Sequence, residues 1–150
     1  MTGERQPIVE EVSIDCMVGI SEEKTRATTD VVFKDGILSK GIVFRKKNNE
    51  VQELTYAWNG SQYDIKDNGK DVVINREISF CTTNFFISEP IGISEVFVER
   101  FNYFVPVESL GNHQYLTKVD GGTNLYTYKN GVLQSVKSTK GVSIYMVLRE

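Results

Sequence analysis

The side chains that could perform acid–base or nucleophilic chemistry are few in this sequence and stand far apart. The single histidine, His113, lies in a predicted strand and is followed by Gln114-Tyr115. A Ser–His–Asp or Cys–His arrangement would use it as a base, but no G-x-S-x-G turn presents a nucleophile. Glycine-rich nucleotide loops and the H-E-x-x-H zinc motif are also missing. We therefore predict a non-enzymatic protein with no catalytic residue and no cofactor.

The two cysteines, Cys16 and Cys81, are 65 positions apart. Neither belongs to a C-x-x-C pair or lies near the histidine, so the common zinc spacings are excluded and we expect no metal site. One interpretation makes both cysteines buried, small apolar residues. The other pairs them in a disulfide of an exported protein.

Carboxylates occur in pairs at Glu10-Glu11 and at Glu22-Glu23. Adjacent residues of a strand point to opposite faces, so neither pair can easily act as an acid–base couple. We interpret both pairs as solvated surface.

Charged and apolar residues alternate between Ser88 and Phe101. On a strand, Val96, Val98 and Arg100 would share one face. In a structural interpretation, Arg100 binds a carboxylate such as Glu89 and ties the segment to its neighbours. In a functional interpretation, Arg100 is held inside the fold to meet the anionic head of a ligand.

The overall charge argues against nucleic acid as a partner. The chain of 150 residues has 17 basic and 20 acidic residues, a net charge of −3, and its longest basic run is Arg45-Lys46-Lys47. Nucleic acid would require a basic excess or stripe, so we expect no nucleic-acid partner.

Apolar runs are only a few residues long, which excludes a membrane-spanning helix. The first residues contain no apolar signal core, so either the chain stays in the cytoplasm or a signal peptide has been removed.

Turn signals divide most of the chain into short segments rich in Val, Ile, Thr, Tyr and Phe, which is typical of antiparallel strands. We predict a tail at residues 1–8 and one all-β domain over 9–150. The predicted turns are Asp35-Gly36, Asn48-Asn49, Asn59-Gly60, Asp67-Asn68-Gly69, Gly111-Asn112, Asp120-Gly121-Gly122, Asn130-Gly131 and Lys140-Gly141.

The lengths of the turns predict which residues face each other across each hairpin. The predicted pairs are Phe33–Leu38, Thr29–Ile42, Ala27–Phe44, Ile42–Leu54, Tyr56–Tyr63, Leu54–Ile65, Ile65–Val72, Tyr63–Ile74, Tyr128–Leu133 and Leu125–Val136. In the first half of the chain these pairs place one apolar face over five consecutive strands. Its principal members are Phe33, Leu38, Ile42, Leu54, Tyr56, Tyr63 and Ile65.

The segment 79–90 interrupts the alternation. Thr82 or Thr83 can cap one helical turn that carries Phe85 and Phe86, and Pro90 prevents the helix from continuing. We predict a short apolar plug or lid.

Several of these motifs together resemble a known family. They are Phe33-Lys34-Asp35-Gly36-Ile37-Leu38, the run from Glu89-Pro90 through Val96-Phe97-x-Glu99-Arg100-Phe101 to Pro106, Gly111-x-His113-x-Tyr115, and Tyr126-Thr127-Tyr128-Lys129-Asn130-Gly131. The chain is similar to an uncharacterised bacterial family of exported calycin-like β-barrels. The resemblance implies an antiparallel barrel of about ten strands and a periplasmic or extracellular location. Two departures are Val98, where a small polar residue is expected, and a missing opening hairpin ahead of residue 10.

These observations leave two functions open. The first is a binding protein that holds a small apolar or amphipathic ligand inside the barrel, against Phe44, Tyr56, Trp58 and Tyr63, with Arg100 near it. The second is a structural or interaction module with a filled interior, which associates through the unpaired edge of strand 9–20. For that edge we expect a two-fold homodimer with antiparallel strands.

Overall fold

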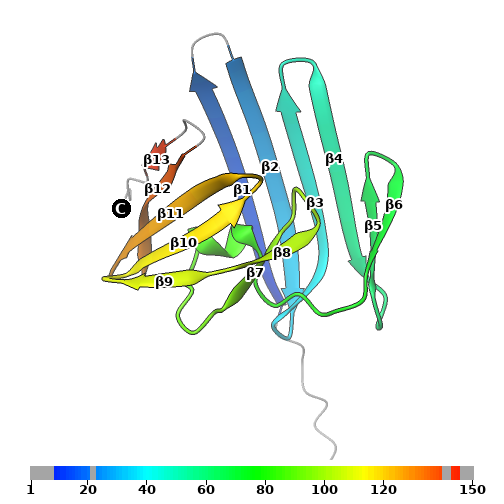
Figure 1. The fold of residues 1–150 in the computed structure, drawn as a ribbon. Helices are drawn as coiled ribbons and strands as arrows, with labels where there is room; N and C mark the ends of the chain where they lie inside the picture. Colours follow the sequence, from blue (N-terminus) through cyan, green and yellow to red (C-terminus); the bar gives the residue numbers. More distant parts are fainter. Residues whose placement is uncertain (1–8, 21–22, 140–142, 146–150) are drawn as a thin grey trace, which may run out of the picture. The chain divides into compact units, whose positions relative to one another are not determined.

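The computed structural model describes residues 9–20, 23–139 and 143–145. The chain divides into two compact units, residues 1–79 and 80–150, and each is a set of antiparallel strands (Figure 1). That the two units form the one domain over 9–150 stays a prediction.

The first unit is one six-stranded antiparallel meander in which every strand pairs with its neighbours in the chain. Its order is β1-β2-β3-β4-β5-β6, from dark blue to green in Figure 1. The strands are β1 (Val9–Ile20), β2 (Glu23–Lys34), β3 (Ile37–Lys47), β4 (Glu50–Trp58), β5 (Tyr63–Asp67) and β6 (Lys70–Ile74).

Local turn chemistry sets where these strands end. The turn between β2 and β3 is Asp35-Gly36, with φ values of 51° and 80°, and the turn between β5 and β6 is Asn68-Gly69, with φ values of 49° and 81°. Two consecutive residues with positive φ suit Asn or Asp followed by Gly, and they match the twist of a two-residue hairpin. The hairpin turns predicted at these positions are confirmed.

One buried row of residues crosses the sheet of the first unit. Val12 faces Val31, Val31 faces Gly41, Gly41 faces Tyr56 and Tyr56 faces Ile65, and all five are buried. A Cβ atom added at Gly41 would lie 3.2 Å from Val31 Cγ1 and 3.6 Å from Tyr56 Cδ2. Glycine at this position leaves room for the tyrosine ring of the neighbouring strand.

A β-bulge corrects the predicted register between β2 and β3. Phe33 faces Leu38 as predicted, but the register shifts between Val32 and Phe33, so that Asp30 rather than Thr29 faces Ile42. Ile42 is consequently 52% exposed, and Val43 is buried in its place. Because an extra residue in one strand reverses the facing of every residue beyond it, the assignment of Ile42 to the core was wrong.

Four further predicted pairs in the first unit were wrong, namely Ala27–Phe44, Ile42–Leu54, Tyr56–Tyr63 and Leu54–Ile65. Val43, not Ile42, faces Leu54, because the bulge has already changed the facing of β3. Beyond β4 the chain forms a loop over residues 59–62, so Tyr56 faces Ile65 and Trp58 faces Tyr63. This shift is by two residues, so it keeps Tyr56 and Ile65 on the predicted face.

The strand pairs at the far end of the sheet are as predicted. Ile65 faces Val72, and Tyr63 faces Ile74. The fully buried Tyr63 donates its hydroxyl hydrogen to Leu38 O at 2.8 Å and accepts the N–H of Ile78 at 3.0 Å. Leu38 N–H in turn donates to Ile78 O at 2.8 Å. The tyrosine therefore holds the chain that leaves β6 against the start of β3.

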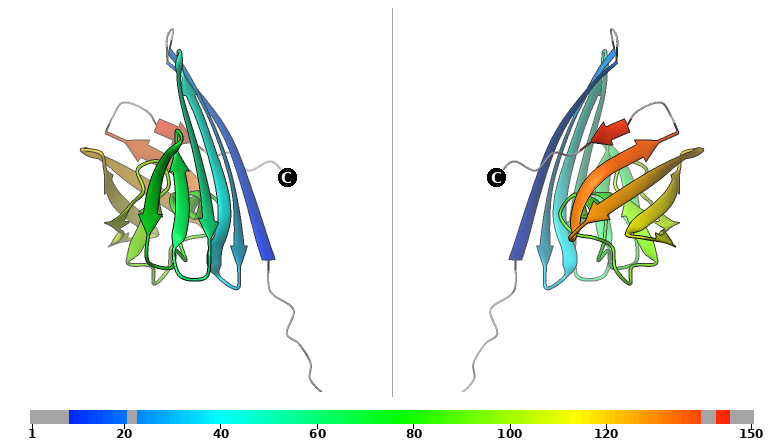
Figure 2. Two further views of the ribbon diagram at one scale, coloured as in Figure 1. Left: turned by 90° about the vertical axis from the view of Figure 1, so that its right-hand side faces the viewer. Right: turned by 90° about the vertical axis from the view of Figure 1, so that its left-hand side faces the viewer.

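The second unit contains a five-stranded sheet, a two-stranded sheet and one short 3₁₀ helix, all visible in the two views of Figure 2. The orders are β13-β12-β11-β10-β9 and β7-β8. The elements are η1 (Thr82–Phe86), β7 (Glu95–Val98), β8 (Tyr103–Pro106), β9 (Glu108–Gly111), β10 (Gln114–Val119), β11 (Gly122–Lys129), β12 (Val132–Ser138) and β13 (Ser143–Tyr145).

A second bulge changes the register between β11 and β12. Tyr128 faces Leu133 as predicted, but the register shifts between Thr127 and Tyr128, so that Tyr126 faces Val136. The predicted pair of Leu125 with Val136 was wrong for this reason. Tyr126, Tyr128, Leu133 and Val136 are all buried.

The predicted helical turn is confirmed at Thr82–Phe86, but the prediction that Thr82 or Thr83 caps it was wrong, because the N-cap is Cys81. Asn84 Oδ1 accepts the backbone N–H of Cys81 at 2.8 Å. Phe85 is fully buried, and its ring stacks on that of Tyr126 with centroids 4.0 Å apart. The helical turn is thus packed into the core of its own unit.

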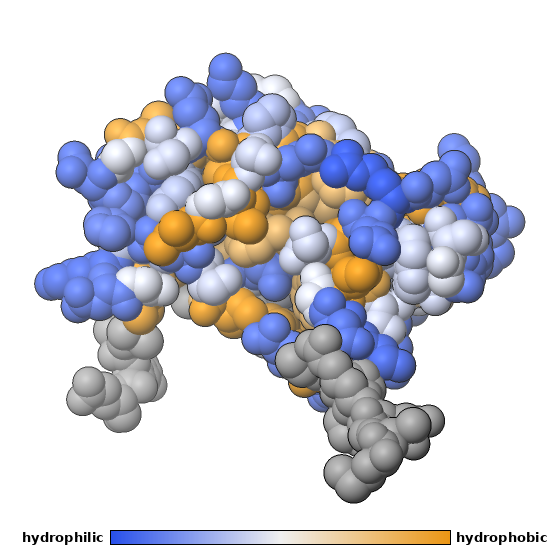
Figure 3. Space-filling view, turned by 90° about the horizontal axis from the view of Figure 1, so that it is seen from below, coloured by the Kyte–Doolittle hydropathy of each residue, from blue (hydrophilic) through white to orange (hydrophobic). Residues whose placement is uncertain are grey.

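The prediction of an all-β antiparallel fold with one short helical turn is confirmed. In the described part of the chain the strands pair as three sheets, and no helix there is long and apolar enough to cross a membrane. Figure 3 shows one face of the molecule, on which apolar residues, in orange, are exposed together with polar residues, in blue.

Candidate functional site

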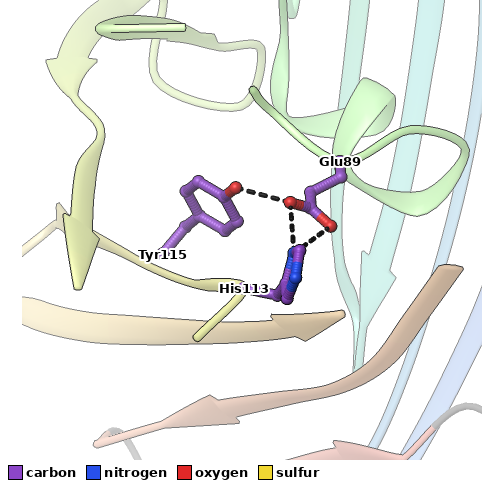
Figure 4. A network of polar contacts seen from close by, with 3 residues as sticks. All are labelled: Glu89, His113 and Tyr115. Carbon is purple, nitrogen blue, oxygen red and sulfur yellow. Dashed lines mark hydrogen bonds and ion pairs between the residues drawn. The ribbon is translucent and has the colours of Figure 1, made fainter. Parts of the chain in front are cut away.

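A carboxylate, an imidazole and a phenol meet in the second unit (Figure 4). His113 Nδ1 lies 2.9 Å from Glu89 Oε2 and 3.1 Å from Oε1. The Tyr115 hydroxyl donates to Oε2 at 2.6 Å. The Glu89 side chain is 4% exposed, whereas that of His113 is 63% exposed. We call these three residues the Glu89 cluster.

The turn between β9 and β10 places His113 within reach of Glu89. Gly111, Asn112 and His113 all have positive φ, at 81°, 53° and 60°. Positive φ is costly for residues with a Cβ, so two of the three need support from neighbouring contacts. His113 O accepts the N–H of Tyr128 at 3.0 Å, and Glu89 holds the ring. These two contacts supply that support.

The hydrogen bonds from Tyr115 and His113, in that order, lower the pKa of Glu89 despite its burial. The pKa of Tyr115 is raised to about 12, first by burial and then by its bond to Glu89. The cluster therefore contains an ionised carboxylate and a neutral phenol at neutral pH. An imidazole whose Nδ1–H donates to a carboxylate keeps Nε2 as its basic nitrogen. Among the described residues no group of three or more His, Cys, Asp or Glu side chains could hold a metal ion.

Glu99 forms a second acidic cluster at the start of the helical turn. Its Oε2 accepts the hydroxyl hydrogen of Thr82, and its Oε1 accepts the N–H of Thr83 at 3.2 Å. Glu99 is only 5% exposed, and this burial raises its pKa above the usual value. A carboxyl group at the first N–H groups of a helix acts as a cap. We call Glu99, Thr82 and Thr83 the Glu99 cluster.

Cys81 lies beside the Glu99 cluster as a free, fully buried thiol. Its Sγ donates to Asn84 Oδ1 at 3.1 Å. Burial, and next the charge of Glu99, raise the pKa of this thiol well above the usual value. A thiol with a raised pKa is a poor nucleophile, which fits the interpretation of Cys81 as a buried, small residue. The side chain of Cys16 lies outside the described residues.

The structure brings three of the residues predicted to bind a ligand together in the first unit. Tyr56 and Tyr63 are buried, and Trp58 is half-buried. The rings of Trp58 and Tyr63 have centroids 4.7 Å apart. Phe44 follows the buried Val43 directly in β3, so it lies on the opposite face of the sheet. The bulge between β2 and β3 is the reason that it departs from the predicted group.

Arg100 is exposed in the second unit, directly after the buried Glu99. Its guanidinium lies over the ring of Phe101, 4.7 Å from the centroid. Partial burial is the main cause that lowers its pKa, and the carboxylate of Asp120 acts in the opposite direction. The carboxylate of Glu89 is held by His113 and Tyr115. Arg100 is therefore not the partner of Glu89, and a structural pairing of Arg100 with another carboxylate stays a prediction.

The tyrosines that hold the helical segment were not among the predicted site residues. Tyr115 binds Glu89, and the Tyr128 hydroxyl donates to Phe85 O at 2.6 Å. The rings of the two tyrosines meet edge to face, with centroids 5.7 Å apart. The signal was present in Tyr115 of β10 and in Tyr126 and Tyr128, which alternate along β11, because buried tyrosines generally need a partner for the hydroxyl group.

The comparisons with known proteins identify a family without an assigned role. No curated protein and no solved structure is detectably similar to the chain. One family model matches residues 3–149, which is nearly the whole sequence. The chain therefore belongs to the family described as a domain of unknown function, DUF6134.

Proposed function

We propose that this chain is a non-enzymatic interaction module that associates through the edge of its six-stranded sheet. The observation that supports the proposal is the position of β1. It pairs with β2 along its whole length, from Val9 opposite Lys34 to Ile20 opposite Glu23. In the described part of the chain no strand pairs with its other side. A strand of 12 residues at a sheet edge offers a row of backbone donors and acceptors to another strand.

The packing of the aromatic side chains favours this function over ligand binding in the interior. Tyr56 is 2% exposed and Tyr63 fully buried, and the Tyr63 hydroxyl is already bonded to backbone groups of its own unit. In the second unit, Phe85 and Tyr126 are stacked and equally buried. A ligand would have to displace these contacts, which a filled core opposes. The small lipophilic ligand stays a prediction.

The barrel, the origin and the location that the family resemblance implies also belong to the proposal. A calycin-like barrel that is left open at β1, a bacterial origin and a periplasmic or extracellular location are what the resemblance implies. An exported interaction module would meet its partners outside the cytoplasm.

A second copy of the chain is the partner to which the proposal commits. Two β1 edges can pair antiparallel about a two-fold axis, as in isologous dimers. Light scattering at about 100 μM should then give twice the mass of one chain, and native mass spectrometry of the same sample should show no added lipophile. The mass of a single chain at this concentration would overturn the dimer, and a bound small molecule would favour the ligand-binding function.

A pair of proline variants separates edge pairing from folding. Glu10 and Glu11 are exposed neighbours near the start of β1. Backbone groups of neighbouring residues in a strand point to opposite sides, so one N–H faces β2 and the other faces the free edge. Of Glu10→Pro and Glu11→Pro, one should lower the melting temperature and the other should abolish the dimer with little change in melting. Dimers that persist in both variants would contradict an edge interface.

A further inference from the structure

Three Asn-Gly pairs occur in the sequence, at Asn59-Gly60, Asn68-Gly69 and Asn130-Gly131. Asparagine before glycine is prone to deamidation, because glycine has no side chain to hinder attack by its own backbone nitrogen. The reaction requires the asparagine side chain to turn until its Cγ meets that nitrogen. Hydrogen bonds that hold the amide in another position should therefore slow it.

The amide of Asn59 is held firmly in the loop between β4 and β5. Its Oδ1 accepts the N–H groups of Ser61 and Gln62, both at 2.9 Å, and the Ser61 hydroxyl at 3.1 Å. Its Nδ2 donates to Asp64 Oδ2 at 3.2 Å. Both ends of this amide have partners.

The amide of Asn68 is also held at both ends, by the backbone of β4. Its Oδ1 accepts the N–H of Glu53 at 2.7 Å, and its Nδ2 donates to Val51 O at 3.2 Å. These contacts bind the turn between β5 and β6 to the neighbouring strand. Rotation of the Asn68 side chain would break both of them.

Asn130 differs from the other two. It is exposed in the two-residue turn between β11 and β12, where Lys129 faces Val132, and its φ is 53°. Across the described ranges 9–20, 23–139 and 143–145, its side chain makes no hydrogen bond. We propose that Asn130 is a site of spontaneous deamidation in the folded protein, and that Asn59 and Asn68 are protected by their hydrogen bonds.

The chemistry needs only water and a base. The Gly131 nitrogen loses its proton and attacks Asn130 Cγ, a C–N bond forms, and the side-chain nitrogen leaves as ammonia with that proton. Water then opens the resulting five-membered imide at one of its two carbonyl carbons. Opening at one carbon gives aspartate, and opening at the other gives isoaspartate, in which the backbone continues through the former side chain.

The two products should affect the turn differently. Aspartate followed by glycine also favours a turn with two positive φ values, so the hairpin can persist. Isoaspartate adds one methylene to the backbone of a two-residue turn. It must therefore disturb the pair of Lys129 and Val132 that closes the turn and, next to it, the buried pair of Tyr128 and Leu133.

The experiment is incubation of the folded protein at 37 °C and pH 8.5 for two weeks, followed by peptide mapping with mass spectrometry. The three Asn-Gly pairs serve as internal controls for one another. Conversion at Asn130 should exceed that at Asn59 and Asn68 at least fivefold, with isoaspartate as the main product. In urea-unfolded protein the three rates should become similar, because only the fold separates them.

Two results would overturn the proposal. Equal rates at the three sites in folded protein would show that the hydrogen bonds do not protect. Faster conversion at Asn59 would show that the three donors to its Oδ1 activate the carbonyl more than they restrain it. The variant Asn130→Asp has no amide to lose at this position, so the release of ammonia there and the mass change that accompanies it should be absent, and conversion at the other two sites should be unchanged.

Discussion

Two glutamates of the second unit have pKa values that shift in opposite directions. Glu99 bonds to the first residues of the helical turn, and Glu89 follows the end of that turn in the sequence. As whole residues, Glu99 is buried, with 5% exposed, and Glu89 is half-buried. The pKa of Glu99 is raised, first by burial, and that of Glu89 is lowered, first by the hydrogen bond from Tyr115.

The balance between burial and hydrogen bonding accounts for the difference. At Glu99, burial outweighs the hydrogen bonds from the hydroxyl of Thr82 and the N–H of Thr83. At Glu89, the hydrogen bonds from Tyr115 and then from His113 outweigh the smaller effect of burial. Desolvation therefore prevails at the more deeply buried carboxyl, and hydrogen bonds prevail at the less buried one.

The largest expected effect is the loss of the Glu99 cluster. Glu99→Ala should lower the free energy of unfolding by about 3 kcal/mol, because the buried Thr83 N–H and the half-buried Thr82 hydroxyl lose their partner and a cavity forms. Urea unfolding followed by fluorescence measures this. Glu108→Ala is the control: Glu108 is exposed in β9, and its replacement should change stability by less than about 0.5 kcal/mol. Equal effects in the two variants would contradict a structural role for Glu99.

Amide substitutions should separate the two glutamates directly. Glu89→Gln should lower the free energy of unfolding by about 1–2 kcal/mol. The fold favours the charged form of Glu89, and hydrogen bonds to a charged acceptor are stronger than those to a neutral amide. Glu99→Gln should cost less than about 1 kcal/mol, because the fold favours the neutral form and the Thr82 hydroxyl can rotate to accept from the amide. Both are read from urea unfolding at pH 7. The reverse order of costs would refute the assignment of charge.

The pH dependence of stability should show the two signs. Glu89 has a lowered pKa, so its contribution is complete above about pH 4.3 and is lost as pH falls through the folded value. Glu99 has a raised pKa, so its contribution is complete below about pH 4.3 and declines as pH rises through the folded value. Between pH 2.5 and 7, the free energy of unfolding of Glu89→Gln should fall less steeply as the pH is lowered than that of the parent chain. In Glu99→Gln the decline with rising pH should be absent. Parallel curves of the free energy of unfolding against pH for both variants and the parent chain would contradict the opposite pKa shifts of the two glutamates.

The smallest expected effect concerns Arg100, the neighbour of Glu99. A buried partner of a carboxylate would cost roughly 3–5 kcal/mol when replaced. Arg100 is instead exposed, with its guanidinium over the ring of Phe101. Arg100→Met should therefore lower stability by less than about 1 kcal/mol. Thermal melting in parallel with Arg100→Lys tests this, and a loss as large as that of Glu99→Ala would restore a structural role for the arginine.

The candidate site could be predicted from the sequence only in its parts. Glu89, Glu99, His113 and Tyr115 all stand in motifs that the sequence analysis singled out, and the helical turn at 82–86 was expected there. Their partners could not be assigned, because Glu89 and His113 are 24 positions apart and Glu99 and Thr82 are 17 apart. Contacts at such separations depend on how strands stack and not on local preference.

The sequence by itself determined the class of the fold and most of its turns. Asn-Gly and Asp-Gly adopt positive φ for local steric reasons, and alternating apolar residues form strands with one buried face. Tertiary structure alone decided the register beyond two bulges. Each bulge adds one residue to a strand, and this reverses the facing of Ile42 in one hairpin and of Val136 in another. The charge of each glutamate was decided in the same way, because it depends on how deeply the folded chain buries the carboxylate and on which donors it brings there.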